Sequence, residues 1–123
     1  MSEPLDVVRR FCATWSTLDI DQIMSFFAED AVYHNIPIAP LVGHADIRTM
    51  IESFTAGVDR IDFDVLHAVA DGGLVMTERV DRFTSSTGVI NLPVMGTFEV
   101  DGEKITAWRD YFDLNQFMSQ LPS

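Results

Sequence analysis

The sequence predicts an α+β fold, in which helices pack on the concave face of one curved, antiparallel-rich β-sheet and form a single cone-shaped domain. Apolar residues recur at helical spacing through much of the first half of the chain, but they alternate with polar residues in the second half. The turn sequences Asp71-Gly72-Gly73 and Asp101-Gly102 join the alternating segments as hairpins. A cone of this kind leaves an apolar pocket between sheet and helices, where small ligands commonly bind.

Three helices are predicted ahead of the hairpins. The first covers residues 4–17, with Pro4 in its first turn. A second, short helix follows Asp19, which can cap it. A third runs over residues 43–54, and Gly57 ends it. Each helix has an apolar stripe: the first has Leu5, Val8, Phe11, Cys12 and Trp15, the second has Ile20, Ile23, Met24 and Phe27, and the third has Ile47, Met50, Ile51 and Phe54.

Five strands are predicted, at residues 31–36, 61–69, 74–83, 89–100 and 104–112, with a short helix over 114–121 after them. Pro37 and Pro40 end the first strand. We expect a bulge or bend in the fourth strand at Pro93 and Gly96, because proline cannot donate a ladder hydrogen bond and glycine weakens a strand. His67 falls on the apolar face of its strand, so we expect it in the core.

Composition and charge exclude several classes of function. The 123 residues suit one domain spanning residues 1–123. There is no long uncharged apolar run, and the N-terminus lacks the basic-then-apolar order of a signal peptide, so we expect a cytoplasmic protein. The net charge of −11 disfavours nucleic acid and anionic membranes as partners. The expected ligand is therefore a small neutral or apolar molecule.

Metal chemistry is not expected. Cys12 is the single cysteine, so the chain can form neither an intrachain disulfide nor a cysteine metal site. The three histidines show no ligand spacing such as His-x-x-x-His. We therefore expect no metal ion.

The most informative feature is a set of charged residues on strand faces that should point inward. Alternation places Arg79 and Asp81 on one face of the strand at 74–83, and Asp110 on the same face as Trp108 and Phe112. Ionised groups are rarely buried unless they pair or take part in chemistry. If these residues converge, one carboxylate keeps a proton and the other stays ionised, which provides a general acid and a general base.

The strand at 31–36 carries a polar face made by Tyr33 and Asn35. A hydroxyl and an amide are suitable partners for a water molecule, and Asp110 could accept one of its protons. Asp81 could then protonate a leaving oxygen on the other side of the substrate. This arrangement suits the opening of an epoxide, where water attacks while the ring oxygen takes a proton.

Three motifs together resemble the limonene-1,2-epoxide hydrolase family: Arg79-Val80-Asp81, the run from Trp108 to Asp113, and Tyr33-His34-Asn35 followed by Pro37. The likeness covers residues 18–117. It implies a cone fold like that of nuclear transport factor 2 and SnoaL-like proteins, and a cofactor-free, one-step hydrolysis of epoxides to vicinal diols by a homodimer. Carried over by motif, it implies that Asp110 is the base, Asp81 the acid and Arg79 the link between them, and that Tyr33 and Asn35 hold the water.

The expected pocket walls are apolar and aromatic side chains: Phe54, Phe83, Leu92, Val94, Trp108 and Phe112. Bulky Phe54 and Phe83 are expected to narrow the pocket. Relative to the family pattern the chain starts late and ends soon after Phe117, so we expect it to lack a longer N-terminal segment that would close the pocket or support a dimer.

Other interpretations of the same residues remain open. Arg79, Asp81 and Asp110 could form a purely structural ion-pair cluster, Tyr33 and Asn35 could bond the backbone at a strand end, and Trp108 could serve packing alone. An isomerase or cyclase on the same cone would also need a carboxylate base and a hydrogen-bond donor. A non-catalytic protein that binds a small ligand is the third alternative.

Overall fold

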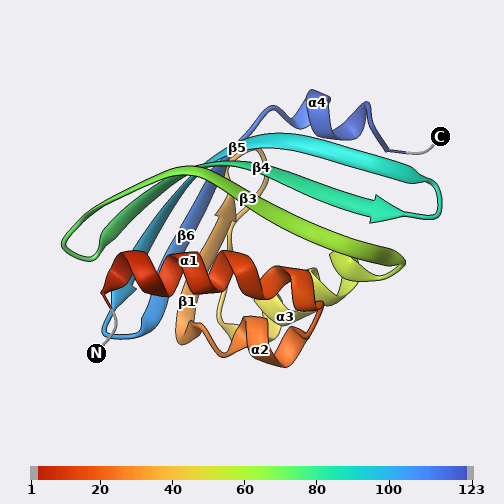
Figure 1. Ribbon diagram of the computed structural model, residues 1–123. Helices are drawn as coiled ribbons and strands as arrows, with labels where there is room; N and C mark the ends of the chain where they lie inside the picture. Colours follow the sequence, from red (N-terminus) through yellow and green to blue (C-terminus); the bar gives the residue numbers. More distant parts are fainter. Residues whose placement is uncertain (1–2, 122–123) are drawn as a thin grey trace.

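A single six-stranded sheet wraps over three helices in the computed structural model, which describes residues 3–121 (Figure 1). The elements follow in the order α1 (Pro4–Thr14), a 3₁₀ turn (Trp15–Thr17), α2 (Ile20–Met24), β1 (Phe27–Asn35), β2 (Leu41–Val42), α3 (His44–Thr55), β3 (Val58–Asp71), β4 (Leu74–Ser85), β5 (Gly88–Asp101), β6 (Lys104–Tyr111) and α4 (Leu114–Met118). Helices α1, α2 and α3 lie under the concave face, and α4 lies beside β5. The predicted α+β cone is therefore confirmed.

The sheet order, β2-β1-β6-β5-β4-β3, brings the first strand of the chain, β1, next to the last, β6. All neighbouring strands are antiparallel except β1 and β6, which run parallel and place Tyr33 opposite Trp108 and Asn35 opposite Asp110. Because the side chains of paired residues lie on the same face of a sheet, this register sets the polar face of β1 beside the charged face of β6.

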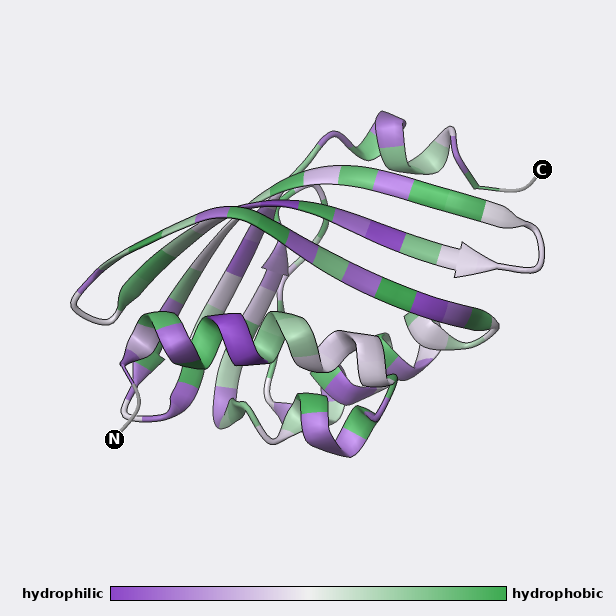
Figure 2. Ribbon diagram, in the orientation of Figure 1, coloured by the Kyte–Doolittle hydropathy of each residue, from purple (hydrophilic) through white to green (hydrophobic). Residues whose placement is uncertain are grey.

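The core lies between α1 and the concave face of the sheet. Phe11 of α1 is fully buried and makes edge-to-face contacts with Phe27 and Trp108, with ring centroids 5.3 and 5.0 Å apart. Such pairs stabilise a core beyond the area that they bury. Colouring by hydropathy shows hydrophobic and hydrophilic residues alternating along the strands, as expected for a sheet with one covered face (Figure 2).

The helices begin and end close to their predicted positions. The Asp19 carboxylate accepts a hydrogen bond from the backbone N–H of Gln22 at 3.2 Å, which confirms the predicted cap of α2. Strand β1 begins four residues before the predicted start, and the two-residue strand β2 was not predicted. So short a strand carries no alternation that a sequence pattern could reveal.

A bulge or bend was expected at Pro93 and Gly96, and the pairing shows no bulge at either residue. Strand β5 pairs with β4 without a register shift from end to end, and Pro93 lies in the part of β5 beyond its pairing with β6. That side of the strand is a free edge, where a proline is tolerated. Near this edge the Gln120 side chain accepts from the backbone N–H of Asn91 at 3.0 Å and donates to its carbonyl at 2.8 Å, which ties the C-terminal segment to β5.

The expected burial of His67 is also wrong. The pairing of β3 with β4 shifts between Val65 and His67, so the inward-facing series ends at Val65. An extra residue in a strand reverses the facing of every residue that follows. The His67 side chain is therefore exposed, and its Nδ1 lies 2.8 Å from a carboxylate oxygen of Glu78.

Within residues 3–121, no helix combines the length and the apolar character needed to cross a bilayer.

Candidate active site

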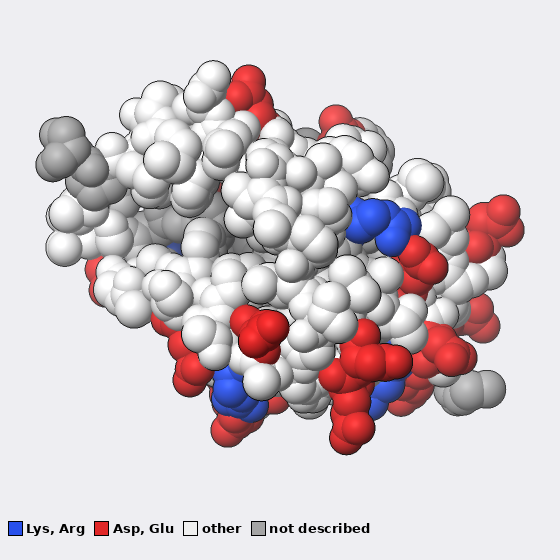
Figure 3. Space-filling model, turned by 180° about the vertical axis from the view of Figure 1, so that it is seen from behind, with Lys and Arg blue, Asp and Glu red and all other residues white. Residues whose placement is uncertain are grey.

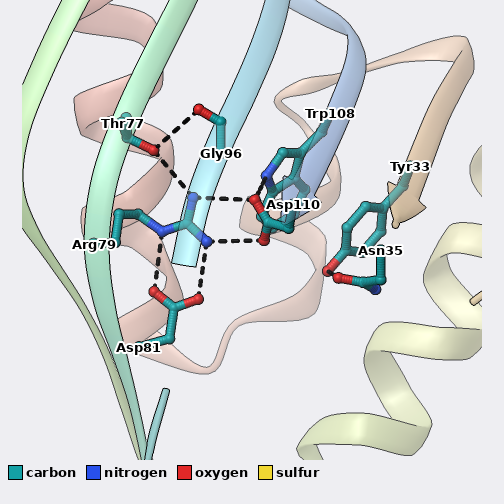
Figure 4. Close-up of polar contacts among 8 residues, drawn as sticks. All are labelled: Tyr33, Asn35, Thr77, Arg79, Asp81, Gly96, Trp108 and Asp110. Atoms are coloured by element: carbon teal, nitrogen blue, oxygen red, sulfur yellow. Dashed lines mark hydrogen bonds and ion pairs between the residues drawn. The ribbon is translucent and has the colours of Figure 1, made fainter. Parts of the chain in front are cut away.

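A buried arginine on β4 bridges two buried aspartates (Figure 4). Arg79 donates from Nε and Nη2 to the two oxygens of Asp81, at 3.0 and 2.9 Å. It donates from Nη1 and Nη2 to the two oxygens of Asp110, at 3.2 and 2.8 Å. Arg79 is 0% exposed and each aspartate 4%. Both contacts are bidentate, the strongest geometry for an arginine–carboxylate pair.

The remaining guanidinium hydrogen is also bonded. Arg79 Nη1 donates to the Thr77 hydroxyl at 3.1 Å, and that hydroxyl lies 3.5 Å from the carbonyl oxygen of Gly96. All five N–H donors of the guanidinium therefore have an acceptor. The group also lies over the ring of Phe63, with its central carbon 5.1 Å from the ring centroid.

The cluster holds one more negative charge than positive charge when both carboxylates are ionised. Burial raises the pKa of Asp81 from 3.8 to about 6, against the opposing attraction of Arg79 and with help from the Asp110 charge. Burial disfavours the charge of Arg79, but the two carboxylates together hold its pKa well above the usual value. Arg79 thus stays charged, and Asp81 carries a proton more readily than an ordinary aspartate does.

Asp110 has an additional donor that its partner aspartate does not share. Trp108 Nε1 donates to Asp110 Oδ1 at 2.6 Å, so Oδ1 accepts from both Trp108 and Arg79. Oδ2 accepts from Arg79 alone among the contacts of the cluster. A carboxylate oxygen can accept two hydrogen bonds, so Oδ2 keeps a site for one further donor.

Tyr33 and Asn35 lie next to this carboxylate, as the parallel pairing of β1 and β6 requires (Figure 4). The Tyr33 ring stacks on Trp108, with centroids 4.2 Å apart and planes 3° from parallel. Its hydroxyl donates to Asn35 Oδ1 at 3.4 Å, so the two side chains bond each other and not the backbone. Burial raises the pKa of Tyr33, which keeps this hydroxyl protonated.

A pocket of about 150 Å³ opens in front of these groups. Its floor includes Tyr33, Asn35, Asp81 and Asp110, while Arg79 lies behind the carboxylates. Its walls are apolar and aromatic: Trp15, Ile38, Met50, Phe54, Phe63, Phe83, Leu92, Val94, Phe112, Leu114 and Phe117. In the space-filling view a hollow opens between uncharged side chains, while acidic residues gather elsewhere on that face (Figure 3).

Five of the six predicted wall residues line the pocket: Phe54, Phe83, Leu92, Val94 and Phe112. Trp108 does not, because Tyr33 stacks over its ring and leaves it 0% exposed. Two residues that complete the environment of Arg79, Thr77 and Gly96, were not predicted from the sequence. A glycine in the middle of a strand can signal that another group approaches closely, and that was the available clue to Gly96.

The histidines lie outside the pocket. His34 Nε2 lies 2.9 Å from the backbone carbonyl oxygen of Ile38, and His44 Nε2 lies 2.9 Å from that of Phe27. In the described part of the chain, no group of three or more His, Cys, Asp or Glu side chains could hold a metal ion.

Gly96 leaves the space through which the guanidinium reaches Asp110. It pairs with Thr77 on β4 and with Asp110 on β6, and a Cβ built on it would collide with Arg79 Nη1 and lie 2.6 Å from Asp110 Oδ1. Since both groups are held by several hydrogen bonds, Gly96→Ala should lower the free energy of unfolding by about 1–3 kcal/mol. Chemical denaturation measures this, with Thr97→Ala on the outer face as the control. Equal stability of Gly96→Ala and wild type would contradict the expected crowding.

Comparison with known proteins gives a consistent family assignment. The limonene-1,2-epoxide hydrolase catalytic domain matches residues 2–123. Epoxide hydrolase EphG of Mycobacterium tuberculosis is 32% identical over 116 residues, which cover 93% of this chain and 76% of that protein. A solved structure of an M. tuberculosis LEH-like epoxide hydrolase has a TM-score of 0.83 at 28% identity, covering 94% of this chain and 86% of the other.

The cone itself is shared more widely. A protein of Shewanella denitrificans proposed to be a SnoaL-like polyketide cyclase has a TM-score of 0.85 at 18% identity, covering 94% of this chain and 93% of that one. At that identity the likeness concerns the fold alone. The match over almost the whole chain and the identity to EphG show that this chain belongs to the limonene-1,2-epoxide hydrolase family.

Proposed function

We propose that this protein is a cofactor-independent epoxide hydrolase that adds water to a small or medium apolar epoxide in one step and yields a vicinal diol. The observation that carries the proposal is the double bridge of Arg79 between Asp81 and Asp110, buried at the polar end of an otherwise apolar pocket. Family membership supports the reaction class. The charge of −11 agrees with an uncharged substrate.

Asp110 is the proposed general base. A water molecule bonded to Tyr33 and Asn35 would donate to Asp110 Oδ2, the oxygen with a remaining acceptor site. As the water oxygen forms a bond to one epoxide carbon, its proton passes to Asp110. Tyr33 and Asn35 are the proposed positioning groups, and their rigidity comes from the stacking of Tyr33 on Trp108.

Asp81 is the proposed general acid. It lines the same pocket, and its raised pKa lets it carry a proton at mildly acidic pH. When the carbon–oxygen bond of the epoxide breaks, that proton goes to the leaving oxygen, which becomes the second hydroxyl of the diol. One proton has then been gained by Asp110 and one lost by Asp81, so a single proton transfer between them restores the enzyme.

Arg79 is the proposed link between the two carboxylates. Its Nη2 contacts both of them, and the total charge of the cluster is the same before and after the reaction. The guanidinium can therefore stabilise whichever aspartate is ionised without moving. Such a preorganised charge needs no reorientation during the reaction.

A cyclase or isomerase on the same cone is the competing interpretation. It would use a carboxylate to take a proton next to a carbonyl group and would add no water to its substrate. Turnover in water labelled with heavy oxygen distinguishes the two. The proposed hydrolase places one labelled oxygen in the diol, whereas an isomerase or cyclase product contains none.

We also propose that the protein is a homodimer, as the family resemblance implies. Val69, Met76, Met95 and Tyr111 form an exposed apolar area on the outer face of the sheet. Neighbouring charges there are already paired, as Arg109 with Glu99 at 2.6 Å. Two copies of a chain with charge −11 could meet at such a face with little repulsion. Light scattering should give the mass of two chains, and the mass of one would contradict the proposal.

Replacement of Asp110 by Asn should lower kcat by at least about 100-fold, because general base catalysis contributes a factor of this size or more. The measurement is diol formation from cyclohexene oxide. Asp59→Asn removes the same charge from an exposed site on β3 and should turn over like wild type. If Asp110→Asn is folded and as active as wild type, Asp110 is not the base.

The raised pKa of Asp81 predicts a pH dependence of activity and a pH dependence of stability. Because the acid must be protonated, kcat/KM should fall about tenfold for each pH unit above about 6.

Between pH 3.8 and about 6 the folded state binds more protons than the unfolded state, so the free energy of unfolding should fall as pH rises through this window. Asp81→Asn should lose this part of the pH dependence of stability. An identical dependence in wild type and variant would show that the pKa of Asp81 is not raised.

A further inference from the structure

The pocket has a polar end and an aromatic end, and the strands give its direction. Asp81 and Phe83 are two residues apart on β4, and Phe112 follows Asp110 of β6 by two residues, directly after the end of that strand. Strands β4 and β6 are each antiparallel to β5 and so run in the same direction. Both phenylalanines therefore lie on the same side of their aspartates, about 7 Å farther along the sheet.

Three rings from different elements close that end. Phe54 of α3 meets Phe83 edge to face, with centroids 4.8 Å apart and planes at 87°. Phe54 also faces Phe117 of α4 at 6.4 Å and 26°. All three rings line the pocket. Phe54 is thus the central member of a contact series that spans helix α3, the sheet and helix α4.

The space between the two ends matches a single small ring. A cavity of about 150 Å³ bounded by apolar side chains is large enough for a molecule such as benzene. The pocket here has that volume. The spacing of about 7 Å between Asp81 and Phe83 along β4 is close to the length of one six-membered ring. A substituent on the side of the ring opposite the epoxide would point at Phe54, Phe83 and Phe117.

We propose that Phe54 sets the upper limit of substrate size, so that this enzyme takes epoxides of one unsubstituted small ring and discriminates against rings that carry a branched substituent opposite the epoxide. This inference rests on the proposed function, since it places the epoxide between Asp81 and Asp110. Phe54 is the ring best suited to a test. Phe54 is half-buried on the last turn of α3, whereas Phe83 is 7% exposed and belongs to the buried core.

The test compares kcat/KM for two substrates, cyclohexene oxide and limonene oxide, which carries an isopropenyl group opposite the epoxide and a methyl group on one epoxide carbon. Wild type should prefer cyclohexene oxide, and Phe54→Ala should shift the ratio of the two constants toward limonene oxide by about tenfold or more. Phe26→Ala is the matched control, because Phe26 is another half-buried phenylalanine but lies outside the pocket, against Phe11. Its ratio should equal that of wild type.

An unchanged ratio in a folded Phe54→Ala variant would overturn the inference, as would a wild type that hydrolyses both epoxides equally well. If Phe54→Ala does not fold, Phe54→Leu should give a smaller shift in the same direction. If wild type hydrolyses neither epoxide, the proposed function fails instead. Calorimetric binding of cyclohexanol and of 4-isopropylcyclohexanol then tests the size limit without turnover. Wild type should bind cyclohexanol more tightly, and Phe54→Ala should reduce the difference in affinity between the two alcohols. Equal affinities in wild type, or an unchanged difference in Phe54→Ala, would overturn the inference.

Discussion

The structure depends on one buried guanidinium that satisfies two carboxylates at once. Removing a charged group from water costs several kcal/mol, and the cost is recovered only when partners and hydrogen bonds are nearly ideal. Arg79 meets that requirement because each of its N–H groups has an acceptor and both aspartates bind it through two oxygens. The cluster is nonetheless short of one positive charge. Burial, with the added repulsion of this second carboxylate, makes a proton on Asp81 favourable, and this connects the stability of the fold to the chemistry proposed for the pocket.

The rest of the fold can be understood as the support for this cluster. Strand β4 supplies Arg79 and Asp81, β6 supplies Asp110, and β5 lies between them with Gly96 at the point where the arginine crosses. The parallel pairing of β1 with β6 then brings Tyr33 and Asn35 to the open side of Asp110. Helix α1 covers the remaining concave face with Phe11 and leaves the space between α3, α4 and the sheet as the pocket.

The cone alone does not determine an activity. A protein of Shewanella denitrificans proposed to be a cyclase shares the fold at 18% identity, so the backbone is compatible with other chemistry. The features that favour hydrolysis here are specific side chains: two carboxylates in one low-dielectric site, and Tyr33 and Asn35 beside one of them, Asp110. The aromatic side chains at the other end of the pocket, Phe54, Phe83 and Phe117, bear on which substrate can bind and not on the reaction that it undergoes.

The amino-acid order alone is enough to predict which side chains share a strand face. The period of two places Arg79 with Asp81, Trp108 with Asp110, and Tyr33 with Asn35, and this property is local. The tertiary structure decided what those faces meet. The parallel partnership of β1 and β6, the bulge that turns His67 outward, the hydrogen bond from Trp108 to Asp110 and the empty space at Gly96 all arise between segments far apart in the chain. Alternation within one strand contains no information about the register of its neighbour, so these features could be found only where the strands actually pair.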